Sequence, residues 1–275
     1  MVARSLKFPL ARRIAVGLLA MLAGFHGCSG LSQSVAPLPN RYAVVSDQLQ
    51  VHSDFPLPQH HRLLDDLRAL RGTVQGTLDL PNSDEPVHVY LFENDDRFQA
   101  FLKQNYPEFP ARRAFFVKTD TLLAVYAHWG DRVAEDLRHE VAHGYLHATL
   151  PDIPLWLDEG LAEYFEVPRG NAGVNRPHVE LLVAQAKTAA WQPNLPRLEH
   201  LTSAAEMTQT DYAESWAWVH MMLEGGGPPR ELLQRHLKSL RQQAPVEPIS
   251  VQLGRLGRPP EQMVSEHLAR LTQGG

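Results

Sequence analysis

The segment His139–His143 reads HEVAH and constrains this chain more than any other part of it. It lies within residues 131–149, which are predicted to form one helix. At about 100° per residue on a helix, His143 stands about 40° from His139, and Glu140 stands about 100° from it. The two imidazoles are therefore one turn apart and can bind one zinc ion. Glu140 lies beside them, placed to take a proton from a water molecule on the metal.

The opposite side of the same helix is apolar. It carries Val133, Leu137, Val141 and Ala148. This stripe is predicted to pack on a sheet, so the helix has one core face and one chemical face.

A catalytic zinc site needs three protein ligands and one open position. The only cysteine, Cys28, is remote from the motif. His147 lies about 12 Å along the helix axis from His139, too far for both to bind one ion. A third histidine of the metzincin kind is also excluded, because Leu146 and Thr149 occupy that motif's glycine and histidine positions. The remaining source of a ligand is an acid on another helix.

Residues 155–166 are predicted to form that second helix, after a break at Pro151 and Pro154. Glu159 and Glu163 are one turn apart on it and share a face. An antiparallel return would place this face against the two histidines. Glu159 would then be the third ligand, and Glu163 would accept a hydrogen bond from the free nitrogen of a ligand histidine. The alternative is that both acids face solvent on an amphipathic helix.

Strands are predicted in the first half of the chain and helices in the second, which indicates an α+β fold. The predicted strands are 41–46, 49–52, 87–92, 114–118 and 122–127. The predicted helices before the motif are 61–71, ended by Gly72, and 94–103. The helices predicted after residue 166 are 179–191, 212–224, 231–241 and 260–271.

Composition excludes several classes of protein. Hydrophobic residues make up 44% of the 275 residues, which excludes a disordered chain. A formal net charge of -5 disfavours nucleic acid as a partner. One cysteine excludes a disulfide framework. The sequence does not predict an oligomeric state.

The N-terminus is predicted to be a targeting segment. Residues 1–27 carry four basic residues and no acid, and residues 14–25 form an apolar run of 12 residues. That run has the length of a signal-peptide core. With Cys28 directly after it, the segment resembles a bacterial lipoprotein signal, with 28–40 as a tether. The protein would be exported to the cell envelope and would meet the membrane only through a lipid anchor at Cys28. The alternative is an ordinary secretory signal.

HEVAH followed by WLDEGLAEYF, residues 156–165, resembles the gluzincin metallopeptidases, and more closely the bacterial peptidase MA-like domains. The resemblance extends over residues 41–271 and includes VHVYLFENDDRFQAFL at 87–102 and DYAESWAWVHMML at 211–223. The spacing differs from the best-known gluzincins, because only 15 residues separate His143 from Glu159.

This resemblance implies a zinc-dependent peptidase with a zincin-like fold. Residues 41–170 would form the catalytic subdomain, a small mixed sheet with the two helices, and residues 171–275 a helical subdomain that walls the cleft. His139, His143 and Glu159 would hold Zn²⁺. Glu140 would be the general base, and Glu163 would support the first histidine.

The resemblance also implies how a peptide or protein substrate is held. In such enzymes an edge strand of the sheet pairs with the peptide, and residues 122–127 are the candidate, although they could equally be a core strand. Tyr212 is the expected oxyanion donor. His220 is the second choice, and Tyr145 and His178 are weaker ones.

Two other functions remain open. The chain could be a non-catalytic lipoprotein, a scaffold that keeps the zinc site for structure, although such a site has no need of a base at Glu140. It could also be a zinc hydrolase of a non-peptide amide, for example in the cell wall.

Overall fold

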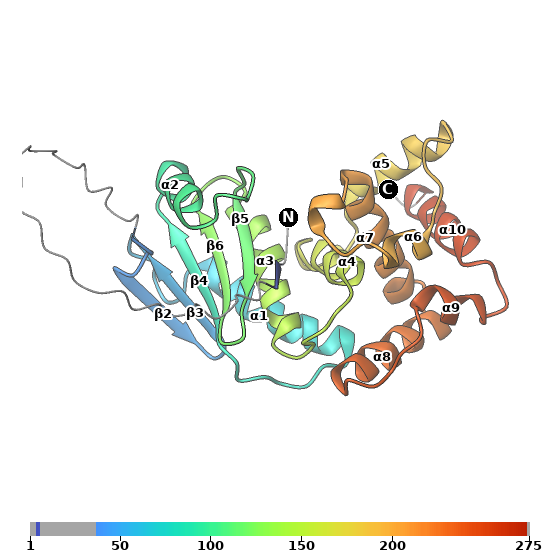
Figure 1. The fold of residues 1–275 in the computed structure, drawn as a ribbon, viewed down its shortest axis with the longest axis horizontal. Coiled ribbons are helices and arrows are strands. Elements are labelled where there is room, and N and C mark those ends of the chain that lie inside the picture. Colours follow the sequence, from blue (N-terminus) through green and yellow to red (C-terminus); the bar gives the residue numbers. More distant parts are fainter. Residues whose placement is uncertain (1–3, 6–36, 274–275) are drawn as a thin grey trace, which may run out of the picture.

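The computed structural model describes residues 4–5 and 37–273. The predicted signal segment, apart from residues 4–5, lies outside the described residues, as do Cys28 and the tether up to residue 36. A sheet with its helices forms one half of the molecule, and a group of helices forms the other (Figure 1). The two halves meet where α3 (Val133–His147) lies beside α4 (Leu155–Phe165).

The sheet is mixed, which confirms an α+β fold. Its strand order is β1-β5-β6-β4-β3-β2. The strands are β1 (Arg4–Ser5), β2 (Tyr42–Ser46), β3 (Leu49–Ser53), β4 (Val87–Phe92), β5 (Ala114–Lys118) and β6 (Leu123–His128). The β3–β4 and β4–β6 pairs are parallel, whereas β2–β3 and β5–β6 are antiparallel. The two residues of β1 pair in parallel with the end of β5.

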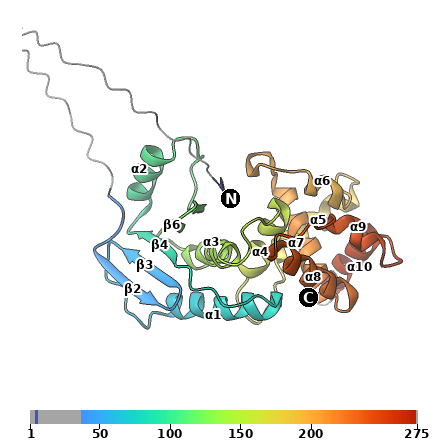
Figure 2. The ribbon, with the colours of Figure 1, turned by 60° about the horizontal axis from the view of Figure 1, so that its bottom comes forward.

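Successive side chains along each strand point to opposite faces of the sheet, so the core has two layers. On one face Val87, Val89 and Leu91 pack with α1 (Arg62–Leu78) and α3. On the other face Tyr126 and Phe115 pack with α2 (Asp95–Asn105). Figure 2 shows α1 and α2 on opposite sides of the sheet.

The predicted edge strand is wrong. β6, which includes most of residues 122–127, lies between β5 and β4. The residues Leu123 to Ala127 are all buried, as expected for an inner strand covered on both faces. Within the part of the chain that the structure describes, only the two-residue β1 lies beyond β5.

The first helix is longer than predicted. Gly72 does not end it, and α1 continues to Leu78. The reason is that the apolar stripe continues through Val74 and Leu78, which are buried, while Gly72 lies on the solvent side. Burial of that stripe outweighs the low helix propensity of glycine.

Helices make up the rest of the described chain. They are α4, α5 (Arg176–Lys187), α6 (Leu195–Glu199), α7 (Gln209–Glu224), α8 (Pro228–Arg241), α9 (Ile249–Gly254) and α10 (Pro260–Gln273), with a 3₁₀ turn at Ala204–Glu206. α6, α9 and the turn are too short to give a readable period and were not predicted. α7 begins three residues early because Thr208 and Asp211 form a capping box at its start.

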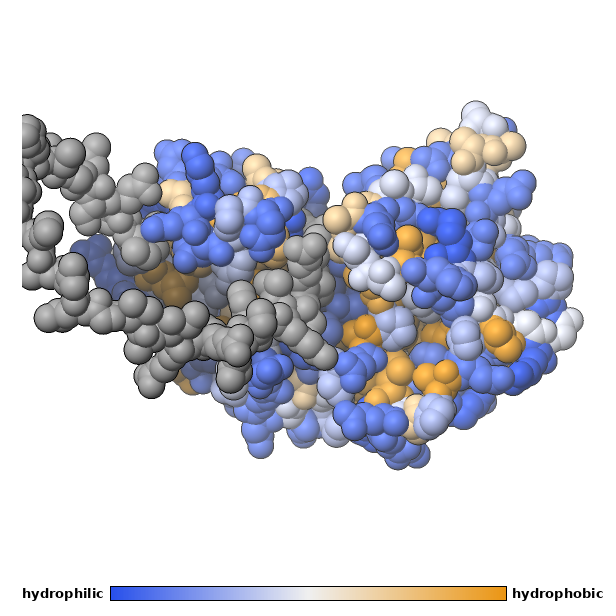
Figure 3. Space-filling view, in the orientation of Figure 1, coloured by the Kyte–Doolittle hydropathy of each residue, from blue (hydrophilic) through white to orange (hydrophobic). Residues whose placement is uncertain are grey.

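One hydrophobic core joins the two halves. It runs from Val89 of the sheet through Leu161 of α4 to Trp216 of α7 and Leu268 of α10. α4 therefore lies inside the molecule, and each of its residues from Trp156 to Phe165 is buried. The surface in Figure 3 is largely hydrophilic, with apolar patches gathered on the helical half. Among the described helices, none has the length and apolar character that crossing a bilayer requires.

Candidate metal centre

The HEVAH helix, α3, is buried on both of its faces. Val141 and Leu137 pack in the core, as predicted, and His139, Glu140 and His143 are each no more than 1% exposed. α4 covers the polar side of α3. The side of α3 that carries His139, Glu140 and His143 is therefore buried between α3 and α4.

The structure brings His139, His143 and Glu159 together. The Nε2 atoms of the two histidines are 3.3 Å apart. Oε2 of Glu159 lies 3.6 Å from Nε2 of His139 and 3.7 Å from Nε2 of His143. These three residues could hold a metal ion, as the sequence predicts.

The donor atoms fit a tetrahedral ion. Ligand atoms on bonds of about 2.0–2.1 Å in tetrahedral array lie about 3.3 Å apart, close to the spacing here. Both carboxylate oxygens of Glu159 are buried and have no hydrogen-bond partner among the described residues. An unpaired buried carboxylate is costly, and a cation at this point would remove the cost.

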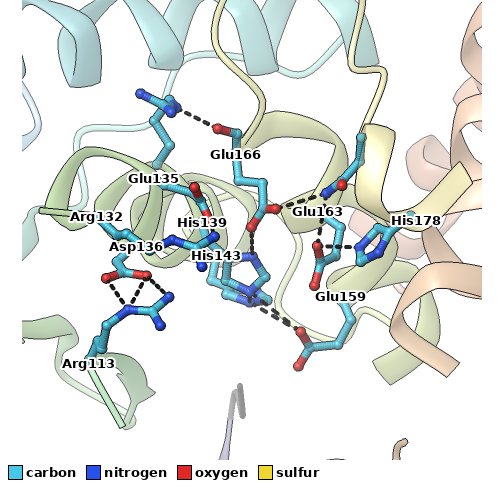
Figure 4. Close-up of polar contacts among 12 residues, drawn as sticks. Arg113, Arg132, Glu135, Asp136, His139, His143, Glu159, Glu163, Glu166 and His178 are labelled. Carbon is cyan, nitrogen blue, oxygen red and sulfur yellow. Dashed lines mark hydrogen bonds and ion pairs between the residues drawn. The ribbon is translucent and has the colours of Figure 1, made fainter. Parts of the chain in front are cut away.

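Each histidine of the centre is oriented through its other ring nitrogen. Nδ1 of His139 lies 3.0 Å from Oε2 of Glu166, and Nδ1 of His143 lies 2.9 Å from Oδ1 of Asp158 (Figure 4 shows the first pair). Each Nδ1–H can donate to its carboxylate, which leaves Nε2 with a lone pair directed at Glu159. His147 does not join His139, as predicted. It contacts the second oxygen of Asp158 at 2.9 Å.

Glu163 does not have the partner that the sequence predicts. Its Oε2 accepts from Nε2 of His178 at 2.7 Å and contacts Asn175 at 3.4 Å. Glu166, at the C-terminal cap of α4, contacts His139 instead. In Figure 4, Glu166 lies over His139 while Glu163 turns toward His178.

Asp158 and Glu166 were missed as partners of the histidines, although the sequence carried a signal for both. Asp158 directly precedes Glu159 in the D-E-G segment. Glu166 follows Glu159 by seven residues, which is two helical turns and the same face. Periodicity alone does not separate Glu163 from Glu166. The choice depends on where α4 crosses α3.

Burial and the neighbouring charges together set the pKa values of the centre. Burial raises the pKa of Glu140, although the neighbouring His139 and His143 oppose the shift. Burial alone would lower the pKa of His139, but its contacts with Glu159 and Glu166 raise it well above the usual value. The pKa of Asp158 is lowered despite its burial, because His143 and His147 both face it. A metal ion must therefore compete with protons for this site.

Tyr212 lies near the centre at the first turn of α7, and its side chain is 9% exposed. Burial raises the pKa of its phenol, and the charges of Glu159 and Glu163 raise it further. The phenol therefore keeps its proton and can act as a hydrogen-bond donor toward the site.

The three alternative donors are engaged elsewhere. His220 contacts the carbonyl of Ala172 at 3.0 Å and His267 at 2.7 Å. The Tyr145 hydroxyl donates to the carbonyl of Leu67. His178 pairs with Glu163. None of these contacts points a donor at the three ligand atoms.

Gly160 allows α4 to lie directly on α7. A Cβ atom at this position would stand 2.5 Å from the carbonyl oxygen of Ser215 and 2.9 Å from the Val219 side chain. Because Glu159 is the preceding residue, the close approach of the two helices also fixes where the third ligand lies.

A cleft opens beside the centre, with a volume of ≈ 770 Å³. Its lining includes Arg113 before β5, Glu135 on α3, Glu166 at the end of α4, and Tyr212 on α7. Charged groups of both signs border it, and its volume lies in the range of ligand-binding pockets.

No protein-family model matches this chain, and no curated protein matches it.

Proposed function

We propose that this chain is a zinc-dependent peptidase of the gluzincin type. The observation that carries the proposal is the triangle of Nε2, Nε2 and Oε2 atoms on His139, His143 and Glu159, with Glu140 beside it. Two imidazoles and one carboxylate are a ligand set that suits zinc and leaves a fourth position for water.

Glu140 supports a catalytic role for the site. It is fully buried, and neither of its oxygens has a hydrogen-bond partner among the described residues. A structural zinc site has four protein ligands and no nearby base. A buried carboxylate next to a three-ligand site is instead what general-base catalysis requires.

The residues of the chain have separate parts in the proposed reaction. Bound zinc would lower the pKa of a water molecule and polarise the scissile carbonyl. Glu140 would hold the proton taken from the attacking water and would pass it to the leaving amine. A carboxylate that accepts a proton in one step can donate it in the next, which is the part of a general base and acid. The Tyr212 hydroxyl donates to the oxygen of the carbonyl under attack.

The proposed substrate is a peptide in extended form. Among the described residues, the outer edge of β5 pairs only with the two residues of β1, and β5 contacts α3. A strand added there would pass the metal centre, which lies on α3 next to β5.

We further propose that the protein is exported and anchored by lipid at Cys28, on the sequence pattern of residues 1–28 alone. Metabolic labelling with palmitate is the test. Label on the wild type and none on Cys28→Ala supports the anchor. Label on both proteins, or on neither, contradicts it.

The catalytic proposal is tested with the zinc-loaded protein and a quenched fluorescent peptide mixture. Glu140→Gln keeps the shape of the side chain but cannot take a proton, so we expect zinc to stay and the rate to fall by about 10²–10⁴-fold. Glu180→Gln, an exposed acid on α5, is the matched control and should keep the wild-type rate. Wild-type activity in Glu140→Gln with zinc bound would contradict the mechanism. No hydrolysis by the wild type would favour a scaffold or a different amide substrate.

A further inference from the structure

Arg112 is held rigidly just before the strand that borders the metal centre. It precedes β5 by two residues. Its Nε donates to the carbonyl of Pro110 at 3.3 Å, and its guanidinium carbon lies 4.7 Å from the centre of the Phe109 ring. An arginine stacked on an aromatic ring loses little further freedom when it binds a ligand.

One terminal nitrogen of the Arg112 side chain has no hydrogen-bond partner among the described residues. Nη1 of Arg112 is buried and has no hydrogen-bond partner within residues 37–273. The adjacent Arg113 differs, because its Nε and Nη2 donate to Asp136 at 2.8 and 2.7 Å. Among the described residues, no carboxylate forms an ion pair with Arg112.

Charged groups of the metal centre act on the guanidinium of Arg112. Burial lowers its pKa, and the charges of Glu140, Tyr212 and Glu159 act against that shift. The adjacent Arg113 pairs with Asp136, which lies one helical turn before Glu140 on α3, so the chain at Arg112 passes near the base. A metal ion at the centre would compensate the charge of Glu159, and the charge of Arg112 would then be available to a bound ligand.

We propose that Arg112 is a specificity residue that binds a carboxylate of the peptide substrate close to the scissile bond. This inference rests on the proposed function and names the substrate class of the same site. A guanidinium that stacks on an aromatic ring and has an unpaired Nη1 is suited to a carboxylate, which accepts charge-assisted hydrogen bonds from it.

Strand direction connects Arg112 with one side of the substrate. A peptide that pairs antiparallel to β5 has its C-terminal side where β5 begins, which is the position of Arg112. The carboxylate is then either the C-terminal group of a short leaving fragment or the side chain of an Asp or Glu. Both sources offer the same chemistry and are separated by experiment.

The experiment uses the full mature protein with zinc and one peptide sequence in four forms. The first pair differs only at the C-terminus, which is a free carboxylate in one form and an amide in the other. Both forms of this pair have the same number of residues after the scissile bond, between one and four. The other two forms carry Glu or Gln on the C-terminal side of that bond and end in an amide. We expect the preferred acid form to be cleaved about 10- to 100-fold faster than its neutral partner, as judged by kcat/KM.

Three variants make the test specific. In Arg112→Gln the ratio of acid to neutral kcat/KM should fall close to one, while the neutral peptide is still cleaved. Arg112→Lys should keep part of the preference. Arg235→Gln, an exposed arginine on α8, should keep all of it. Equal cleavage of acid and neutral forms by the wild type, or an unchanged ratio in Arg112→Gln, would overturn the proposal.

Binding separates failure of this inference from failure of the proposed function. The zinc-loaded Glu140→Gln protein holds the peptides without turnover, so their Kd values are measured by fluorescence polarisation. Tighter binding of the acid forms, lost when Arg112→Gln is added, supports the role of Arg112 even if no peptide is hydrolysed. Equal Kd values for acid and neutral forms overturn it, whatever the activity.

Discussion

Nδ1 of His139 on α3 lies 3.0 Å from Oε2 of Glu166, the residue that caps α4. The equivalent partner of His143 is Asp158, in the first turn of α4. The two ligand histidines are thus oriented from opposite ends of one helix, and Glu159 between them supplies the third donor. This order requires α4 to run antiparallel to α3.

Glu166 should tune the affinity of the metal. In Glu166→Ala, His139 loses the carboxylate that fixes its ring, so we expect the Kd for zinc to rise by about 10–100-fold. Glu166→Gln keeps a hydrogen-bond acceptor but not the charge, and should lie between Glu166→Ala and the wild type. Competition with a chromophoric chelator measures all three.

Glu163→Gln is the control for that series, because Glu163 contacts His178 and Asn175 rather than a ligand histidine. Its effect on the zinc Kd should be smaller than that of Glu166→Gln. A larger effect would show that Glu163 supports the centre in solution and that the arrangement of the two acids is different.

Each of the three ligands should be needed for metal binding. His139→Ala, His143→Ala and Glu159→Ala should each lose most of the single zinc ion expected per chain. The wild type should also unfold at a lower temperature after chelation, because binding to the native state alone stabilises it. Elemental analysis and thermal unfolding measure these effects, and full zinc in all three variants would contradict the assignment.

Gly160→Ala should destabilise the protein by about 1–3 kcal/mol, because the added methyl group would overlap the carbonyl oxygen of Ser215. Gly76→Ala is the matched control. It lies within α1 with open space at its Cβ position, so the same change should stabilise by about 0.5–1 kcal/mol. Urea unfolding of both variants gives the comparison, and equal effects would argue against close packing of α4 on α7.

His236 should make stability depend on pH. Burial lowers its pKa in the folded protein to about 4. Between pH 6.5 and pH 4, His236 is protonated in the unfolded chain but not in the folded one. The free energy of unfolding therefore falls as the pH falls through this window. At pH 5 the loss is about 1–2 kcal/mol for this one group.

The measurement compares the wild type with His236→Leu at pH 7 and pH 5. Carboxylates titrate equally in both proteins, so the difference between the two pH effects isolates His236. The variant should lose less stability than the wild type on acidification. An identical loss would contradict the lowered pKa.

The sequence predicted those parts of the site that depend on one helix at a time. His139, Glu140 and His143 follow from helical spacing within α3, and Glu159 follows from its place in a second helix after a proline break. The α+β order of elements was also readable, because strand-like and helix-like patterns occupy different parts of the chain.

Features that depend on the packing of separate segments were not predictable in this way. Glu163 and Glu166 both lie on the side of α4 that faces the histidines. Which of them contacts His139 depends on where α4 crosses α3. β5 rather than β6 lies toward the edge of the sheet because β4 pairs with β6. Arg112 lies in a loop with no period, so no sequence pattern associated it with the site.

The interior position of α4 has a consequence for the order of events during synthesis. A ribosome releases His139, His143 and Glu159 well before α7, which begins at Gln209. Until α7 emerges, the Gly160 side of α4 has nothing to pack on, and Glu159 is not held at its final distance from the histidines. For the peptidase proposed above, the metal centre would then be completed only after α7 has been made, and the unfolded C-terminal half would not be cleaved during its own synthesis.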